Sequence, residues 1–140
     1  MIGRAGFFIR NANNLPGPGR VSGTTFASPE AFAKYVKKIP GGVVSLLPEQ
    51  SLTINTKNGK TVGYVVSNGK VVGKNVGSND VFTVGTHKQF PNSNVILTIN
   101  GTATPGETIK ARLDMMGVDG YKMSKEPVQT IPFTLKVLAR

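Results

Sequence analysis

Two aspartates are the side chains that come closest to a catalytic or metal-binding arrangement in this chain of 140 residues. Asp114 and Asp119 stand five residues apart, beside Gly117 and Gly120. Two carboxylates at this spacing suit a Ca²⁺ site or an acid–base pair. The segment lacks the further oxygen ligands of a calcium-binding loop, and aspartates beside glycines are common in turns. We therefore interpret both aspartates as turn residues and expect neither a metal nor another cofactor.

A nucleophilic serine or threonine needs a base, and histidine is the most frequent one. His87 is the only histidine in the chain, and its neighbours Thr86 and Lys88 place it in an expected loop. The chain also has no cysteine, seven acidic residues and no phosphate loop of the form GxxxxGK[ST]. We interpret His87 as a solvated loop residue. The sequence predicts a protein that is not an enzyme.

Basic residues are in clear excess, with 17 Lys and Arg against seven Asp and Glu, for a net charge of +10. Residues 1–79 hold ten bases against two acids, whereas residues 80–140 hold seven against five. Such a charge favours an anionic partner, which is a nucleic acid, an acidic protein face or a lipid headgroup surface. The lysines expected to contact it are Lys34, Lys37, Lys38, Lys57, Lys60, Lys70 and Lys74.

The first 27 residues predict an extended arm. They contain three arginines and no acid, and their Pro-Gly-Pro-Gly run at 16–19 continues neither a helix nor a central strand. Two readings stay open for the apolar patch at 7–9, which either anchors on a neighbouring subunit or forms a first strand on the domain's own sheet. The arm residues expected to make contacts are Arg4, Phe7, Phe8, Ile9, Arg10 and Arg20.

One helix is expected over residues 28–39. Ser28 suits the cap and Pro29 the first helical position. Four apolar residues then recur at helical spacing and predict a buried face, while three lysines share the other face. The apolar residues are Phe32, Tyr35, Val36 and Ile39, and the lysines are Lys34, Lys37 and Lys38.

From residue 51 the apolar period changes to two, which indicates strands. Runs at 51–56, 61–66 and 71–72 are separated by Asn58-Gly59 and Asn68-Gly69. Asn-Gly between alternating runs favours type I′ hairpin turns, so we expect a three-stranded meander. The residues expected to face one core are Leu52, Ile54, Val62, Tyr64 and Val66.

Further strands are expected over 81–84, 95–99, 108–113 and 131–138, with a type II turn at Pro105-Gly106 before the third. Residues 114–127 suit a loop or a wide hairpin. These elements predict an all-β fold, mainly an antiparallel sandwich or barrel of jelly-roll or immunoglobulin-like type, with one short helix. We expect a single β-rich domain over 28–140 that follows the arm of 1–27.

A compact β-domain with a basic arm, low charge density and no cysteine is typical of subunits that build larger assemblies. The sequence favours a non-enzymatic structural subunit of a virus particle, such as a minor capsid, vertex or cement protein of an icosahedral phage, located in the virion. Its expected partners are copies of itself, other structural subunits and packaged nucleic acid through the basic N-terminal half. This is an analogy at the level of protein class.

Two other functions stay open. The main alternative is a cytoplasmic single-stranded nucleic-acid-binding protein with an OB-like barrel, for which Tyr64 and Phe82 are the candidate stacking residues. An exported immunoglobulin-like adhesive module would need an export signal. The apolar stretch Ala5–Ile9 is too short for one, and no uncharged stretch approaches the about 20 residues of a membrane helix. We therefore expect no transmembrane segment.

Overall fold

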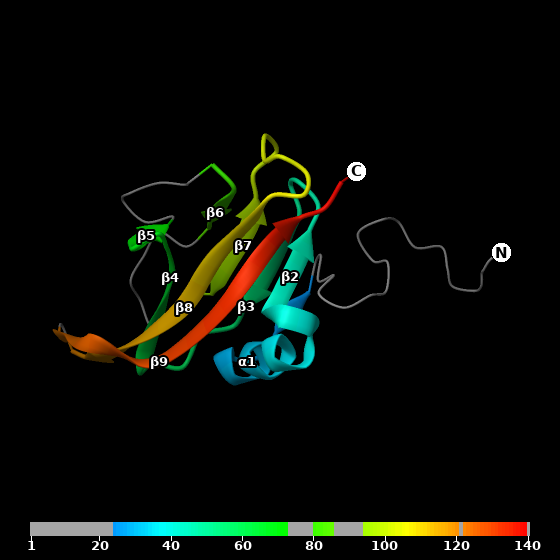
Figure 1. Ribbon diagram of the computed structural model, residues 1–140. Helices are drawn as coiled ribbons and strands as arrows, with labels where there is room; N and C mark the ends of the chain where they lie inside the picture. The colour runs from blue at the N-terminus through cyan, green and yellow to red at the C-terminus, as the bar shows by residue number, and fades with distance from the viewer. Residues whose placement is uncertain (1–23, 73–79, 86–93, 121, 140) are drawn as a thin grey trace.

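The computed structural model describes residues 24–72, 80–85, 94–120 and 122–139. Their strands form two sheets that lie against each other (Figure 1). In spatial order, the five-stranded sheet consists of β2 (Val43–Leu46), β9 (Lys122–Val137), β8 (Thr108–Asp119), β4 (Thr61–Ser67) and β5 (Lys70–Val72). The four-stranded sheet consists of β1 (Thr25–Phe26), β3 (Ser51–Ile54), β7 (Val95–Ile99) and β6 (Phe82–Val84).

Most neighbouring strands run antiparallel. The exceptions among the described strands are β1 beside β3 and β2 beside β9, which run parallel. The two sheets stay separate and do not close into a barrel. The predicted all-β fold is confirmed in its sandwich form, with one short α-helix near the start of the described chain.

One hydrophobic core lies between the sheets and takes side chains from both. Leu52 and Leu97 of the four-stranded sheet and Leu113 and Leu135 of the five-stranded sheet are almost completely buried. Burial of apolar surface of this kind is the main favourable term in folding. The core therefore fixes which face of each strand points inward.

The helix α1 (Pro29–Lys38) begins as the sequence predicts. The Ser28 hydroxyl accepts a hydrogen bond from the Ala31 amide at 3.0 Å. Phe32 is fully buried and packs edge-on against Phe26 and Phe133, with ring centroids 5.1 Å away in both cases. A 3₁₀ turn, η2 (Pro40–Gly42), follows the helix and leads into β2. The three lysines of α1 are exposed, so the predicted facing of this helix is confirmed.

The two Asn-Gly turns behave differently. Asn68 and Gly69 both have positive φ, of 53° and 75°, and they join β4 to β5 as a tight antiparallel hairpin, as predicted. Gly59 has a φ of 74°, but Asn58 does not have positive φ. The Asn58 side chain instead accepts hydrogen bonds from the amides of Lys60 and Thr61. This turn carries the chain from one sheet to the other, so the prediction of a three-stranded meander is wrong.

The predicted direction of β4 is also wrong, although Val62 and Val66 are buried as predicted. Val65 belongs to the core between the sheets, and a Cβ built on Gly63 would lie 3.0 Å from the Val95 side chain of the opposite sheet. Val62, Tyr64 and Val66 therefore lie on the other face of the strand, because successive side chains alternate. Valines occupy both faces of β4, so its apolar pattern left the direction undetermined.

The longest element is the antiparallel hairpin of β8 and β9. It begins after the predicted Pro105-Gly106 turn, where Gly106 has a φ of 87° and the Glu107 amide donates to the Thr104 carbonyl at 3.1 Å. Residues 114–127 form a hairpin, but a long one with a short connection, because β8 continues to Asp119 and β9 begins at Lys122. Figure 1 shows the end of this hairpin projecting beyond the other strands.

The first described strand lies close to the predicted boundary of the arm. Thr25 and Phe26 pair with β3, and Phe26 is buried in the core, so the last arm residues join the sandwich. Residues 1–23 of the predicted arm lie outside the described residues. The helices of the described chain include none that is long and apolar enough to cross a membrane.

Candidate functional site

Only some of the predicted contact residues fall within the described chain. Lys34, Lys37 and Lys38 share the exposed face of α1. Lys57 and Lys60 are exposed in the segment before β4, and Lys70 is exposed beyond its other end, about 20 Å of strand away. The structure therefore does not join them into one patch. The predicted residues outside the described chain are Arg4, Phe7, Phe8, Ile9, Arg10, Arg20, Lys74 and His87.

The two aspartates do not form a joint site. Both lie in β8, and five residues of strand place them about 17 Å apart. Asp119 is exposed at the end of the strand, next to Gly120, which has positive φ. Asp114 is buried inside the strand, which corrects its interpretation as a turn residue. Within the described residues, no three His, Cys, Asp or Glu side chains gather at distances that suit a metal ion.

Asp114 instead forms a polar cluster on the five-stranded sheet. Its two carboxylate oxygens each accept a hydrogen bond from Arg112 Nε at 3.0 Å, and one also accepts from the Thr130 hydroxyl at 3.1 Å. Tyr64 lies opposite Asp114 on β4. Burial raises the pKa of the Tyr64 hydroxyl, so this group stays protonated at ordinary pH. The Asp114 carboxylate is therefore engaged by hydrogen bonds within the sheet.

The distal hairpin, which we define as residues 116–120 and 122–128, differs from the rest of β8 and β9. Between the pairs Met115–Gln129 and Val118–Met123, β8 advances by three residues and β9 by six. The surplus residues form bulges, which bend a strand and increase its twist. The hairpin therefore turns away from the regular sheet.

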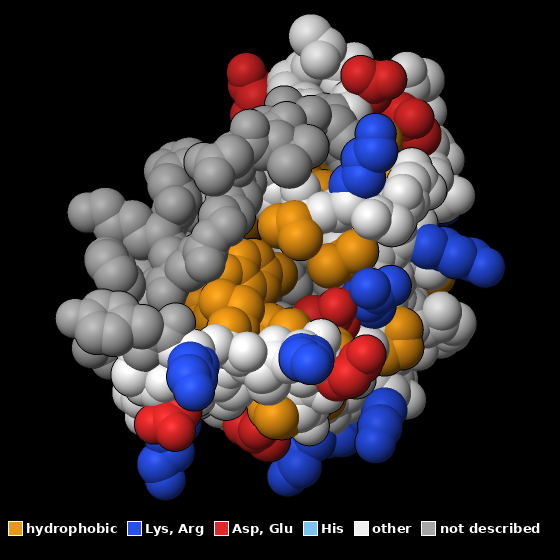
Figure 2. Space-filling model, turned by 90° about the vertical axis from the view of Figure 1, so that its left-hand side faces the viewer, with side chains coloured by type: hydrophobic (Ala, Val, Ile, Leu, Met, Phe, Trp, Pro, Cys, Tyr) orange, Lys and Arg blue, Asp and Glu red, His pale blue; other side chains and the backbone are white. Residues whose placement is uncertain are grey.

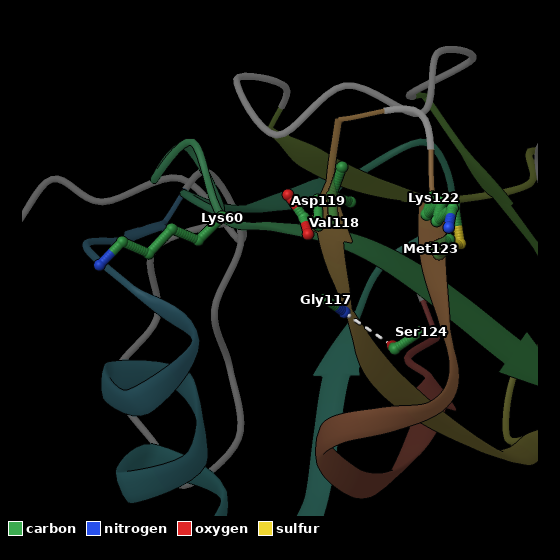
Figure 3. Close-up of a pocket in the computed structure, with 7 residues that line it drawn as sticks. All are labelled: Lys60, Gly117, Val118, Asp119, Lys122, Met123 and Ser124. Carbon is green, nitrogen blue, oxygen red and sulfur yellow. Dashed lines mark hydrogen bonds between the residues drawn. The ribbon is translucent and has the colours of Figure 1, made fainter.

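Ser124 holds this irregular region together. Its hydroxyl accepts a hydrogen bond from the Gly117 amide at 2.9 Å and donates one to the Glu126 carbonyl at 2.8 Å. The first of these bonds bridges the two strands (Figure 3). The Val118 amide also donates to the Lys60 carbonyl at 2.8 Å, which ties the hairpin to the loop before β4. The projecting segment therefore has a defined backbone.

Apolar side chains are exposed on the distal hairpin. Three large hydrophobic side chains of the described residues are exposed, and two of them are Met123 (37%) and Val128 (65%). A shallow, mainly apolar pocket of about 360 Å³ lies beside Met123 (Figure 3). The residues that line it are Lys60, Gly117, Val118, Asp119, Lys122, Met123 and Ser124. A pocket of this size and composition accommodates one or two apolar side chains of another molecule.

The charges of the distal hairpin are balanced, because its two basic residues, Lys122 and Lys125, are matched by two acidic residues, Asp119 and Glu126. Figure 2 shows the face of the molecule that lies at the left of Figure 1, where basic and acidic side chains are interspersed. Exposed apolar side chains among balanced charges suit a protein–protein contact. The arrangement therefore suits binding to another molecule.

No family model, no curated protein and no solved structure matches this chain.

The structure also bears on the barrel alternative. Phe82, one of its two candidate stacking residues, is fully buried in the core, whereas Tyr64 lies on the outer face of the five-stranded sheet. The described strands form a sandwich, so the OB-like barrel is not the fold observed.

The sequence did not identify Met123 and Val128, because the polar residues and Pro127 between them interrupt the alternation that predicts a strand.

Proposed function

We propose that this protein is a non-enzymatic structural subunit of a virus particle, of the minor capsid, vertex or cement type, and that its distal hairpin contacts a neighbouring copy. The observation that carries the proposal is the projection of a charge-balanced hairpin with exposed Met123 and Val128. Scattered exposed apolar residues are ordinary, but two on one projecting element, of which Met123 lines an apolar pocket, favour a contact surface.

The chemistry of the site supports a binding role over catalysis. The pocket is open and shallow, and the hydroxyl of Ser124 is already engaged with the Gly117 amide and the Glu126 carbonyl. A nucleophile needs an adjacent base within hydrogen-bond distance. None of the residues that line the pocket is a histidine, and Asp119 is its one acid.

The mode of contact follows from the prolines of β9. Beyond its short pairing with β2, this strand has an edge over 122–133 that no described strand covers. Pro127 and Pro132 remove two backbone N–H donors from that strand, which disfavours addition of a further strand. The neighbouring copy is therefore expected to dock through side chains, with an apolar residue in the pocket beside Met123.

The test is the mass of the protein in solution, measured by sedimentation at moderate ionic strength so that repulsion between chains of net charge +10 is screened. We expect an oligomer, with a mass at least twice that of the 14.8 kDa chain, and a shift toward the monomer for the double variant M123S/V128S. Ile96→Ser is the matched control, because Ile96 is equally exposed (38%) but lies on β7. A wild-type monomer at all concentrations, or equal dissociation of the control, contradicts the proposal.

A further inference from the structure

Three basic side chains come together on the outer face of the five-stranded sheet, the face turned away from the four-stranded sheet. In β8, Ala111 and Leu113 belong to the core, so Lys110 and Arg112 point outward. In β9, Leu135 and Val137 belong to the core, so Lys136 points outward as well. All three basic residues are exposed.

The strand register brings these side chains close to one another and to hydroxyl groups. Lys110 pairs with Thr134, and Lys136 pairs with Thr108. Side chains in directly opposed positions lie about 5 Å apart and diagonal neighbours about 7 Å apart. The two lysines are such diagonal neighbours, with a threonine beside each. The result is a small cluster of ammonium and hydroxyl donors on two paired strands.

The acidic group on this face does not cancel the cluster. Asp114 is the one acid among the described strand positions that point outward here, and its residue is only 5% exposed. It accepts hydrogen bonds from Arg112 Nε and the Thr130 hydroxyl. The Arg112 side chain nevertheless stays 47% exposed. The face therefore presents net positive charge and hydrogen-bond donors to solvent.

We propose that this basic sheet face, formed by Lys110, Arg112 and Lys136 with Thr108 and Thr134, binds the phosphate backbone of single-stranded nucleic acid. Ammonium, guanidinium and hydroxyl groups are the side chains that make most contacts with phosphate and sugar. Tyr64, partly buried on the same face, lies diagonally across from Arg112 and offers a neutral ring for stacking of an unpaired base.

The composition of the face favours nucleic acid over the other anionic partners. A membrane-binding surface combines basic residues with apolar side chains that insert among the lipids. A contact with an acidic protein needs an apolar centre. The large hydrophobic side chains that are exposed in the described residues are Ile96, Met123 and Val128, and none of them lies on this part of the sheet.

The experiment is a titration of a fluorescently labelled oligothymidylate of about 15 nucleotides, followed by anisotropy at several salt concentrations. The test variant is K110Q/K136Q and the matched control is K34Q/K37Q, which removes the same charge from the exposed face of α1. We expect the test variant to weaken binding about tenfold or more at low salt and the control by less than about threefold. The slope of log K against log[salt] should fall by about 1.4 in the test variant, because each lost phosphate contact accounts for about 0.7.

Both variants change exposed lysines, so circular dichroism is expected to show an unchanged fold. Arg112→Gln is measured separately from these variants, because it also removes the hydrogen-bond partner of Asp114. Equal weakening by the test and control variants would mean diffuse attraction to a basic protein and would overturn the proposal. Absence of oligonucleotide binding by the wild type, with or without binding to vesicles that contain phosphatidylserine, would also overturn it. M123S/V128S should bind the oligonucleotide normally, which separates this proposal from the assembly role of the hairpin.

Discussion

The two halves of the β8–β9 hairpin share the same strands but face different surroundings. In the proximal half, residues 108–115 and 129–137, one side packs on the core, where Leu113 and Leu135 are fully buried. In the distal hairpin none of the described residues belongs to the core, and Val128 is 65% exposed. The proximal ladder is regular, whereas the distal ladder contains the bulges.

The distal hairpin therefore adds little to the burial of the core. Ordering a residue costs about 1–2 kcal/mol of backbone entropy, which burial must offset. The proximal half obtains that burial from the core, and the distal hairpin does not. A projecting segment with exposed apolar side chains therefore supports the contact between copies that we propose.

The largest expected contrast is between core and tip substitutions. Leu113→Ala should lower the free energy of unfolding by about 2–5 kcal/mol, because it leaves a cavity in the core. Val128→Ala should change it by less than about 0.5 kcal/mol, because the side chain is mainly solvated. Urea unfolding at low protein concentration measures both. Similar losses in the two variants would show that the distal hairpin is part of the folding core.

An intermediate contrast is expected between the two aspartates. Asp114→Asn should destabilise the protein by about 1–3 kcal/mol, because the buried side chain loses its charge-assisted bonds with Arg112 and Thr130. Asp119→Asn is the control and should have little effect, since Asp119 is exposed at the end of β8. The same unfolding experiment compares them. A neutral Asp114→Asn would mean that the polar cluster does not stabilise the sheet.

The smallest expected effect concerns Tyr64. Burial raises its pKa above the ordinary value of tyrosine, so the folded protein resists its ionisation. The unfolded chain loses this proton more readily, and stability therefore declines as the pH rises above about 10. The difference in absorbance at alkaline pH between the wild type and Tyr64→Phe isolates this group. Ionisation of Tyr64 at or below the ordinary tyrosine pKa would contradict the partly buried position of its ring.

The parts of the fold that the sequence predicted correctly depend on neighbours along the chain. The cap at Ser28, the apolar spacing of α1 and the Asn68-Gly69 turn are all determined within a few residues. The parts that it missed depend on distant contacts. The Asn58-Gly59 turn leads into the other sheet, and β4 is rotated so that Val65 and Gly63 meet the opposite sheet.

The same reasoning explains the candidate sites. The excess of basic residues lies in the N-terminal half of the sequence, so the sequence pointed to that half. Lys110 and Lys136 become neighbours only when β8 pairs with β9. The alternation of apolar and polar residues in each strand predicts that these lysines point outward, but it does not predict that they lie close together. In the distal hairpin, bulges interrupt the period of two, so Met123 and Val128 carried no strand signal. The predicted contacts of the arm stay predictions.

Hydrogen–deuterium exchange of the wild-type protein at low and high concentration tests the central claim most directly. If the distal hairpin is the contact between copies, amides in 116–120 and 122–128 become protected as the concentration rises. Amides of the proximal half, already protected by the sheet ladders, should exchange slowly at both concentrations. Protection that does not change with concentration in the distal hairpin, or that appears only elsewhere in the chain, would contradict the account.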